Sequence, residues 1–389
     1  MTRRSYLSIV AMRLIFSVCP TSQAAAAVNV IVHRLPAGGV QPQVAVDSRG
    51  VVHLIYLQGD PTRSDIFYVH SDDGGLSWSP PLRVNSQPGS AIAIGTVRGA
   101  QIAIGKDDRI HVAWMGSNVA QPLGPGGSSP MLYARLSANA GGFEPQRNVI
   151  SLHPGLDGGG SIAADRNGNV FVAWHAPNEP GRGEPDRRVW VARSTDDGTH
   201  FAAEFPISDP STGACGCCGM QLSAFDGKVF ALYRGASEQI HRGMYLIDAA
   251  ANLTAPRDRQ LAPMNIGICI MSTAAFAPAP PKLLAAWETN GRVFWSPIDP
   301  GDLDQTQPHP AGSDAAGQKH PAIAGNTTGQ TLVVWAVGTG WNKGGSIAWQ
   351  TFDANARPIA GGAGRGESLP AWGEPAVFAR SDGQFVIVY

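Results

Sequence analysis

The stretches VAVDSRGVVHLIY (residues 44–56) and IAIGKDDRIHVAW (residues 102–114) decide the fold of this 389-residue chain, because they share one pattern. Each reads as a strand, a tight polar turn and a second strand that ends in an aromatic residue, which is the pattern of a β-hairpin. Five further hairpins end at Trp174, Tyr233, Trp287, Trp335 and Tyr389. The sequence therefore contains seven aromatic-ended hairpins.

A second set of hairpins lies between these seven. Clear copies begin at Ile66, Met131 and Val189, and weaker copies begin at Met244, Val293 and Ser346. Each period thus holds four strands, and four-stranded units that repeat around an axis make a β-propeller. No helices alternate with the strands, which argues against a parallel α/β fold.

The number of blades follows from the ends of the chain. A lone strand-like segment, VNVIVHRL (residues 28–35), precedes the first hairpin. We expect seven blades, the last of which combines this segment, as its outer strand, with the C-terminal hairpin and so closes the ring. The alternative is six blades, with one hairpin outside the ring.

Two turns of the second set carry a specific motif. SDDGGLSW contains Ser71, Asp73, Gly75 and Trp78, and STDDGTHF contains Ser194, Asp196, Gly198 and Phe201. In each, the Asp carboxylate is expected to accept backbone N–H groups of its own turn, and the Gly to adopt a positive φ. SANAGGF, from Ser137, is a shortened third copy. These motifs predict structural turns, not a catalytic site.

On these motifs the chain resembles the sialidase superfamily of Asp-box (BNR) propellers. The resemblance implies an all-β propeller and a glycan-type or glycoside-hydrolase-like pocket on the face opposite the Asp boxes. True sialidases clamp the substrate carboxylate with three arginines, since the guanidinium fork binds a carboxylate in two bonds. They also use an Asp as acid/base and a Tyr nucleophile assisted by a Glu.

Candidates for these roles fall in the loops opposite the Asp boxes. Arg34 in HRLP resembles a family arginine motif, Arg98 and Arg234 could complete a clamp, and Asp60 lies where the family keeps its acid/base. Tyr233 and Glu238 are the candidate nucleophile pair. Asp60 equally fits an Asp-Pro turn, and Tyr233 occupies the blade-packing position of Trp114.

The later arginine and tyrosine motifs of the family are not recognisable, so we expect no sialidase turnover. Two histidines in the same loops, His175 and His320, could face the channel, although histidines at strand ends more often make structural hydrogen bonds.

Three of the five cysteines cluster in TGACGCCGM (residues 212–220) as Cys215, Cys217 and Cys218. Cys269 lies in the loop into the next blade, so we expect it near the cluster. Disulfides would suit an exported protein. The alternative is a metal site in which these thiols, with His241 as a further ligand, hold copper or zinc. A thiol redox site built on the same cysteines is a further alternative.

Composition limits the remaining possibilities. The net charge of −1 leaves no electrostatic footprint for nucleic acid, and no membrane span follows the N-terminus. Residues 1–27 have the layout of an export signal, which predicts a periplasmic or secreted protein. Residues 28–389 are expected to form one propeller domain and act as a monomer. A non-catalytic binding platform remains open beside the glycan and metal or redox functions.

Overall fold

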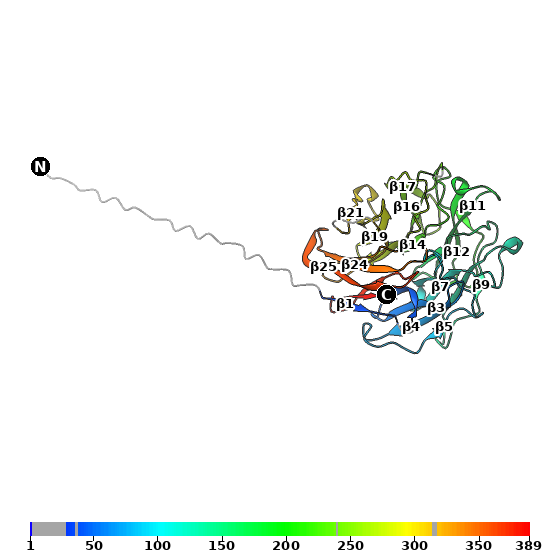
Figure 1. The fold of residues 1–389 in the computed structure, drawn as a ribbon, viewed down its shortest axis with the longest axis horizontal. Helices are drawn as coiled ribbons and strands as arrows, with labels where there is room; N and C mark the ends of the chain where they lie inside the picture. The colour runs from blue at the N-terminus through cyan, green and yellow to red at the C-terminus, as the bar shows by residue number, and fades with distance from the viewer. Residues whose placement is uncertain (2–28, 36–37, 239, 313–316) are drawn as a thin grey trace.

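The computed structural model describes residues 1, 29–35, 38–238, 240–312 and 317–389. The predicted export signal, apart from residue 1, lies outside these ranges. The described residues form seven antiparallel or mixed β-sheets arranged in a ring, and the chain passes through them in sequence order (Figure 1). The predicted all-β propeller with seven blades is therefore confirmed, and the six-bladed alternative is wrong.

Each of the first six blades contains four strands, and in each the strands neighbour one another in chain order. The innermost strands, from the first blade to the seventh, are β2 (Val40–Val46), β6 (Gln101–Ile104), β10 (Gly160–Ala164), β14 (Gln221–Phe225), β18 (Ala274–Ala279), β22 (Gln318–Gly325) and β26 (Ala376–Ala379). The second strands are β3 (Val52–Asp60), β7 (Ile110–Met115), β11 (Val170–Pro177), β15 (Lys228–Arg234), β19 (Lys282–Thr289), β23 (Thr331–Val337) and β27 (Phe385–Val388).

The outer halves of the blades are the second set of hairpins. Their third strands are β4 (Arg63–Ser71), β8 (Met131–Arg135), β12 (Arg187–Ser194), β16 (Met244–Ala250), β20 (Arg292–Ile298) and β24 (Gly345–Phe352). Their outermost strands are β5 (Leu82–Arg83), β9 (Arg147–Asn148), β13 (Phe205–Pro206), β17 (Arg257–Ala262), β21 (His309–Pro310) and β25 (Pro358–Leu369).

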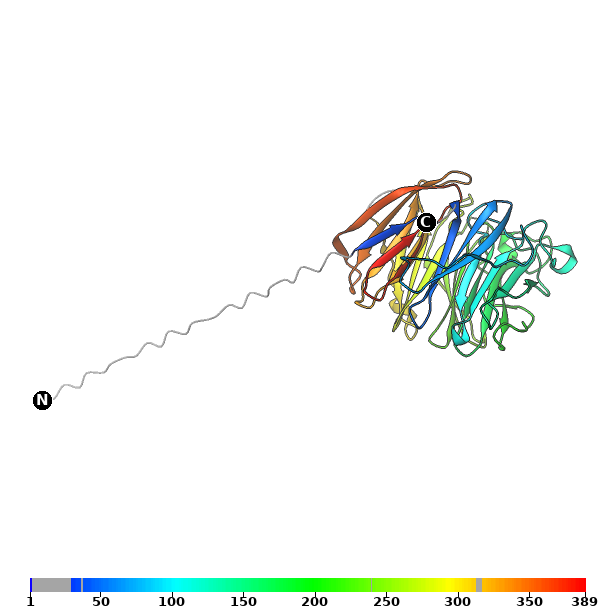
Figure 2. The same cartoon turned by 90° about the horizontal axis from the view of Figure 1, so that it is seen from below.

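The seventh blade joins the two ends of the chain. Strand β1 (Val30–His33) pairs in parallel with β27, with Val30 opposite Phe385 and His33 opposite Val388. Figure 2 shows the blue N-terminal strand beside the red C-terminal strand. This blade has three strands, and its inner strand β26 lies next to β2 of the first blade. The ring closes as the sequence predicted.

The strand-end aromatic residues hold neighbouring blades together. Trp174 is fully buried and packs with Met131 and Tyr133 of the preceding blade. Trp114 and Trp287 are also fully buried in the equivalent places of their blades. Burying a large apolar side chain contributes about 1.5–3 kcal/mol relative to leaving it exposed. The sequence repeat therefore reflects packing between blades.

The innermost strands of all seven blades line a central channel of about 550 Å³. Because these strands run in the same direction, their first residues share one end of the channel. We call this end the mouth; it is formed by Thr96, Val97, Gly160, Gly219, Thr273, His320 and Glu374. The other end carries the turns that contain the Asp boxes. Within the described ranges, no helix is long and apolar enough to span a membrane.

Candidate functional site

A buried pair of a histidine and a carboxylate side chain lies at the mouth of the channel. Nδ1 of His320 is 3.1 Å from Oε1 of Glu374, and both side chains are almost fully buried. Ser272 and Thr273 hold the histidine, because the Ser272 hydroxyl accepts the His320 backbone N–H and the Thr273 hydroxyl faces Nδ1. His320 adopts a positive φ of 50°. The pair joins the sixth and seventh blades at the channel wall.

A charged pair, Arg98 and Asp157, lies on the rim of the same opening. The Arg98 guanidinium donates from Nε to the Asp157 carbonyl at 2.8 Å and from Nη2 to its carboxylate at 3.1 Å. Asp157 is about half exposed, with 47% of its side chain accessible. The two bonds fix the guanidinium plane, because its donors have a rigid fork geometry.

An exposed tryptophan lies against this arginine. The Arg98 guanidinium carbon is 6.0 Å from the centre of the Trp341 ring, within the range of a cation–π contact. Trp341 is 46% exposed, and its backbone carbonyl accepts the indole N–H of Trp372 at 2.7 Å. A Cβ atom added at Gly95 would lie 2.7–3.0 Å from Arg98 and Trp341 atoms. Glycine is therefore required for this close approach.

A small recess of about 10 Å³ lies between this group and the His320–Glu374 pair. It is lined in part by Thr96, Met271, Lys319 and His320, together with Trp341. The Lys319 ammonium donates to the Ile270 carbonyl at 2.6 Å. The rim thus combines an exposed aromatic face, fixed cationic donors and a half-exposed carboxylate. Such a mixture of one apolar surface and a few positioned polar groups is typical of small-ligand sites.

His175 lies on the same side of the propeller but is not accessible. Its side chain is buried, and burial together with the nearby Arg187 guanidinium lowers the pKa of the imidazole to about 4. Arg187 Nη1 is 3.4 Å from His175 Nδ1. His175 is therefore neutral at pH 7 and packs between loops.

Two of the residues expected to resemble sialidase catalytic groups lie in ordinary structural settings. Arg34 is exposed at the end of β1, and its guanidinium carbon lies 5.0 Å from the centre of the Tyr389 ring. Asp60 is exposed at the β3–β4 turn, where its carboxylate accepts the Thr62 backbone N–H and hydroxyl, each at 2.8 Å. The Thr62 N–H lowers the pKa of Asp60. Asp60 thus makes the turn that its Asp-Pro sequence also predicted.

Of the three remaining candidates for catalytic residues near β15, two are buried and one is exposed. The buried Tyr233 hydroxyl donates to Asp258 Oδ2 at 2.6 Å, and burial raises the pKa of Tyr233. Arg234 is buried and donates to Glu288 at 2.8 Å. Glu238 is exposed, and its carboxylate lies 3.3 Å from His241 Nε2. A substrate cannot reach Tyr233 or Arg234 in this arrangement, so their catalytic roles remain predictions without support from the geometry.

The cysteine loop lies beside the mouth. A Cβ atom on Gly216 would lie 2.9 Å from Asp157 Oδ2, which places this loop against the rim. Cys217 forms a disulfide bond with Cys269, with the Cα atoms 6.4 Å apart. The expected proximity of Cys269 to the cluster is confirmed. Cys215 and Cys218 are buried free thiols.

The three sulfur atoms of the loop form a compact group. Cys215 Sγ lies 3.4 Å from Cys217 Sγ and donates to Cys218 Sγ at 3.3 Å. The hydrogen bond from Cys215 lowers the pKa of Cys218 to about 6, against the effect of burial. The same hydrogen bond raises the pKa of Cys215. The pair therefore shares one proton near neutral pH.

Charged groups surround the thiols. Arg242 Nη1 donates to Cys215 Sγ at 3.0 Å, and its Nη2 donates to Glu184 at 2.6 Å. Glu184 also accepts the Gly216 backbone N–H at 2.8 Å, which holds the loop in place. A guanidinium this close favours a thiolate over a thiol.

Only some of the predicted metal ligands lie close together. The sulfur atoms of Cys215, Cys217 and Cys218 lie within 4.8 Å of one another, but Cys217 is bonded to Cys269. His241 points elsewhere, since its Nδ1 is 2.8 Å from Asn265 Oδ1 and its Nε2 faces Glu238. Copper or zinc at these thiols remains a prediction.

The Asp-box turns have the predicted hydrogen bonds. Asp73 accepts the backbone N–H groups of Leu76 and Ser77 and the hydroxyls of Ser71 and Ser77. These bonds lower the pKa of Asp73, the Ser77 hydroxyl contributing most. Gly75 has a φ of 88°. The first Asp box is thus a self-contained turn far from the mouth.

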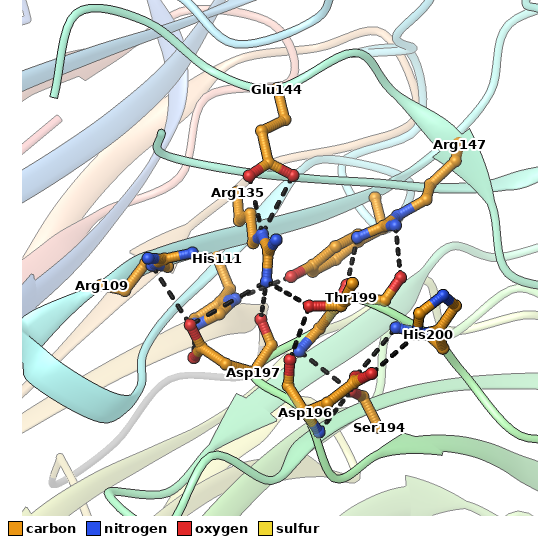
Figure 3. A network of polar contacts seen from close by, with 12 residues as sticks. Arg109, His111, Arg135, Glu144, Arg147, Ser194, Asp196, Asp197, Thr199 and His200 are labelled. Atoms are coloured by element: carbon orange, nitrogen blue, oxygen red, sulfur yellow. Dashed lines mark hydrogen bonds and ion pairs between the residues drawn. The ribbon is translucent and has the colours of Figure 1, made fainter. Parts of the chain in front are cut away.

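The second Asp box is tied to the preceding blade (Figure 3). Asp196 accepts the His200 backbone N–H at 2.9 Å and faces its ring at 2.7 Å. The next residue, Asp197, contacts Arg109 at 3.2 Å and His111 at 3.4 Å. Figure 3 also shows Arg135 reaching from Glu144 toward the Thr199 hydroxyl. This polar network joins the second and third blades.

Several residues of the mouth and the cysteine loop could not be recognised from the sequence. Trp341, Asp157 and Glu374 lie in loops or strand starts without a recognisable motif, and so do Glu184 and Arg242. The one available indication was position, because all five lie in connections opposite the Asp boxes. Chemical type alone would not distinguish them from other loop residues.

Comparison with solved structures shows the same fold in carbohydrate-active enzymes. The chain is similar to an α-L-arabinanase of Penicillium chrysogenum complexed with arabinobiose, with a TM-score of 0.54, 12% identity, and coverage of 84% of this chain and 98% of that one. It is also similar to a sialidase of Trypanosoma rangeli in complex with the inhibitor DANA, with a TM-score of 0.51, 11% identity, and coverage of 80% and 56%.

A third similar structure is a mutant of an α-L-arabinofuranosidase of Fusarium graminearum, with a TM-score of 0.54, 9% identity, and coverage of 88% and 97%. The chain has a sialidase-like propeller fold. No protein-family model and no curated protein sequence matches it. At these identities the likeness concerns the fold alone.

Proposed function

We propose that this protein is an exported propeller that binds an oligosaccharide at the mouth of its channel, next to Trp341 and Arg98. The observation that carries the proposal is an exposed tryptophan placed against an arginine whose plane is fixed by Asp157. The tryptophan offers an apolar face for a sugar ring. Arg98 and Asp157 offer a donor and an acceptor for its hydroxyl groups.

The surroundings favour this location over the rest of the surface. Gly95 lets the two side chains pack closely, and the neighbouring recess contains Lys319 and His320. The group is therefore pre-organised, which reduces the entropy lost on binding. Carbohydrate-active enzymes of the same fold, such as the arabinanase that was solved with arabinobiose, make a saccharide the first ligand class to test.

Binding without sialidase turnover is the form of the function that the geometry supports best. Tyr233 and Arg234 are buried with partners of their own, so the nucleophile and one clamp arginine of a sialidase are not accessible. Asp157 and Glu374 are carboxylates at the mouth, but Glu374 is buried against His320. A hydrolase that uses these two groups would therefore require the mouth to open.

Export is part of the proposal. The layout of residues 1–27 predicts it, and the Cys217–Cys269 disulfide supports it, because such bonds persist in oxidising compartments.

The test is a calorimetric titration of the purified protein with a panel of oligosaccharides that includes arabino-, sialyl- and uronic-acid-containing members. We expect at least one to bind, and we expect Trp341→Ala and Arg98→Met each to weaken it about tenfold or more. Phe205→Ala removes an aromatic side chain of similar exposure from the outer strand β13 and should bind as the wild type does. Equal loss in all three variants, or no binding by the wild type, would remove the proposal.

A further inference from the structure

The loop with residues 215–218 brings a dithiol and a disulfide into contact. Cys215 and Cys218 are separated by two residues, and their sulfur atoms lie 3.3 Å apart. Cys215 Sγ also lies 3.4 Å from Cys217 Sγ, the inner sulfur of the Cys217–Cys269 disulfide. Cys215 therefore faces two possible bonding partners at nearly equal distances.

The four cysteines differ in their exposure to solvent. Cys215 and Cys218 are buried, Cys217 is half-buried, and Cys269 is exposed. The exposed Ile268 lies next to Cys269. An external reagent can thus approach Cys269 directly, whereas Cys215 and Cys218 offer it almost no surface.

The protein environment suits thiolate chemistry better than a bound cation. Arg242 lies 3.0 Å from Cys215 Sγ, and Arg234 donates from Nη1 to the Arg242 carbonyl at 3.0 Å and pairs with the buried Glu288. A fixed guanidinium beside the sulfurs stabilises negative charge on them. It opposes a metal ion at the same place.

We propose that the four cysteines form a thiol–disulfide exchange relay, in which the buried Cys215/Cys218 dithiol passes two electrons through the Cys217–Cys269 bond to an external disulfide. This activity is independent of saccharide binding. Its substrate class is a disulfide-bearing small molecule or peptide that reacts at the exposed Cys269.

The relay begins inside the protein. Cys215 passes its proton to Cys218, attacks Cys217 Sγ and forms a Cys215–Cys217 bond, while Cys269 leaves as a thiolate and takes a proton from water. Cys218 then loses its proton to water and attacks Cys215 Sγ. Cys217 leaves as a thiolate that takes up a proton. The chain has exchanged one disulfide for another, without an outside oxidant.

The second stage restores the surface bond. Cys269 loses its proton to water, attacks an external disulfide R–S–S–R as a thiolate and forms a mixed disulfide. The departing R–S⁻ takes up a proton and leaves as R–SH. Cys217 attacks Cys269 Sγ of the mixed disulfide, forms Cys217–Cys269 again and releases the second R–SH. The chain ends with two disulfides, and the external disulfide has gained the two electrons.

The experiment follows individual disulfides with oxidised glutathione as the probe. The full-length protein is isolated without reductant, quenched in acid, alkylated, digested and mapped by mass spectrometry, so that Cys19 is scored separately. We expect Cys217–Cys269 together with a fraction of Cys215–Cys217 or Cys215–Cys218 isomer. On incubation with oxidised glutathione, we expect the release of two reduced glutathiones per chain and the appearance of Cys215–Cys218.

Two variants separate the relay from a static disulfide. Cys218→Ser keeps Cys217–Cys269 and should show no Cys215–Cys218 bond and no release of two glutathiones. Cys217→Ser/Cys269→Ser removes both sulfur atoms of the surface bond and should slow the oxidation of the buried pair about tenfold or more, because burial limits direct access. Thermal melting by circular dichroism checks that both variants fold.

Three results would overturn the relay. The first is a wild-type chain that shows no isomer and releases no glutathione. The second is oxidation of the buried pair at the wild-type rate in a folded Cys217→Ser/Cys269→Ser protein. The third is a protein from its native compartment that carries one copper or zinc ion per chain on these thiols in place of the disulfide. Loss of saccharide binding would leave the relay unaffected, so the two proposals fail separately.

Discussion

Arg234 and Glu288 form a buried ion pair between the fourth and fifth blades, with Nη2 of the arginine 2.8 Å from Oε2 of the glutamate and each side chain 1% exposed. Arg234 also donates to the Glu288 and Arg242 carbonyls, and Glu288 accepts the Gly291 backbone N–H. Both Nη atoms of Arg234 and both carboxylate oxygens of Glu288 therefore have partners. It anchors β15 to β19 and explains why a conspicuous arginine opposite the Asp boxes is not available to a ligand.

We predict that Arg234→Met destabilises the protein by about 3–5 kcal/mol, because it leaves the Glu288 carboxylate buried without its partner. The double variant Arg234→Met/Glu288→Met should lose less, since it removes both charges. Urea unfolding measures both. A single variant as stable as the wild type would show that the pair is not important for blade packing.

Asp73→Asn should weaken the first Asp box and lower the midpoint of thermal unfolding, because the amide nitrogen that replaces Oδ2 cannot accept the Ser77 hydroxyl. The remaining amide oxygen is also a weaker acceptor for the Leu76 and Ser77 N–H groups than a carboxylate. The folded-state pKa of Asp73 lies below its ordinary value of 3.8. Its contribution is therefore present above that pH and is lost as the pH falls further. The difference between variant and wild type should shrink in acid, and oligosaccharide affinity should not change. An affinity loss would contradict the separation of the two faces.

We predict that His175 makes the protein less stable in weak acid. Its pKa falls from 6.5 to about 4 on folding, so the unfolded chain binds a proton between these values that the folded chain does not. The stability is full above about pH 6.5 and declines toward pH 4, by about 3 kcal/mol from this group. In His175→Gln the free energy of unfolding should depend less on pH over this range. An identical dependence would assign the effect to other groups.

The contribution of the β1–β27 pair to stability should be measurable with one substitution at a buried position and one at an exposed position. Replacement of Val386 by Asp places a charge in the buried strand that pairs with Ile31, and we expect a loss of several kcal/mol or no folded protein. Val32→Asp, at the exposed position beside it, is the matched control and should unfold near the wild-type temperature. Similar behaviour of the two variants would mean that the seventh blade contributes little.

The architecture could be predicted because its evidence is local and repeated. Each hairpin shows its strands, its turn and its final aromatic residue within a short stretch, and Trp114, Trp174 and Trp287 recur because every blade meets its neighbour in the same way. The closing strand could be predicted too, since one unpaired segment and one incomplete blade remained.

The site could be predicted only as a region. Arg98 was found through its chemical type and loop, but its partners Asp157 and Trp341 come from other blades, 59 and 243 positions away (157 − 98 and 341 − 98). Arg234 is likewise an arginine at a loop opposite the Asp boxes, yet it is buried against Glu288. Contacts between residues that are far apart in the sequence cannot be read from it, and the chemical type of a residue does not show whether its side chain is buried.

The cysteines are an intermediate case. Because the two loops lead into adjacent blades, Cys269 was predicted to lie near the cluster, and its disulfide with Cys217 confirms this. The choice of Cys217 as its partner depends on how the Glu184 carboxylate and Arg242 guanidinium hold the loop, which no spacing rule specifies.

The most direct test of the central claim is a crystal structure of the protein with the tightest-binding oligosaccharide of the panel. The account predicts a sugar ring against the exposed face of Trp341, with its hydroxyl groups bonded to Arg98 and Asp157. A saccharide bound on the outer strands or at the Asp-box end, with the mouth left empty, would contradict it.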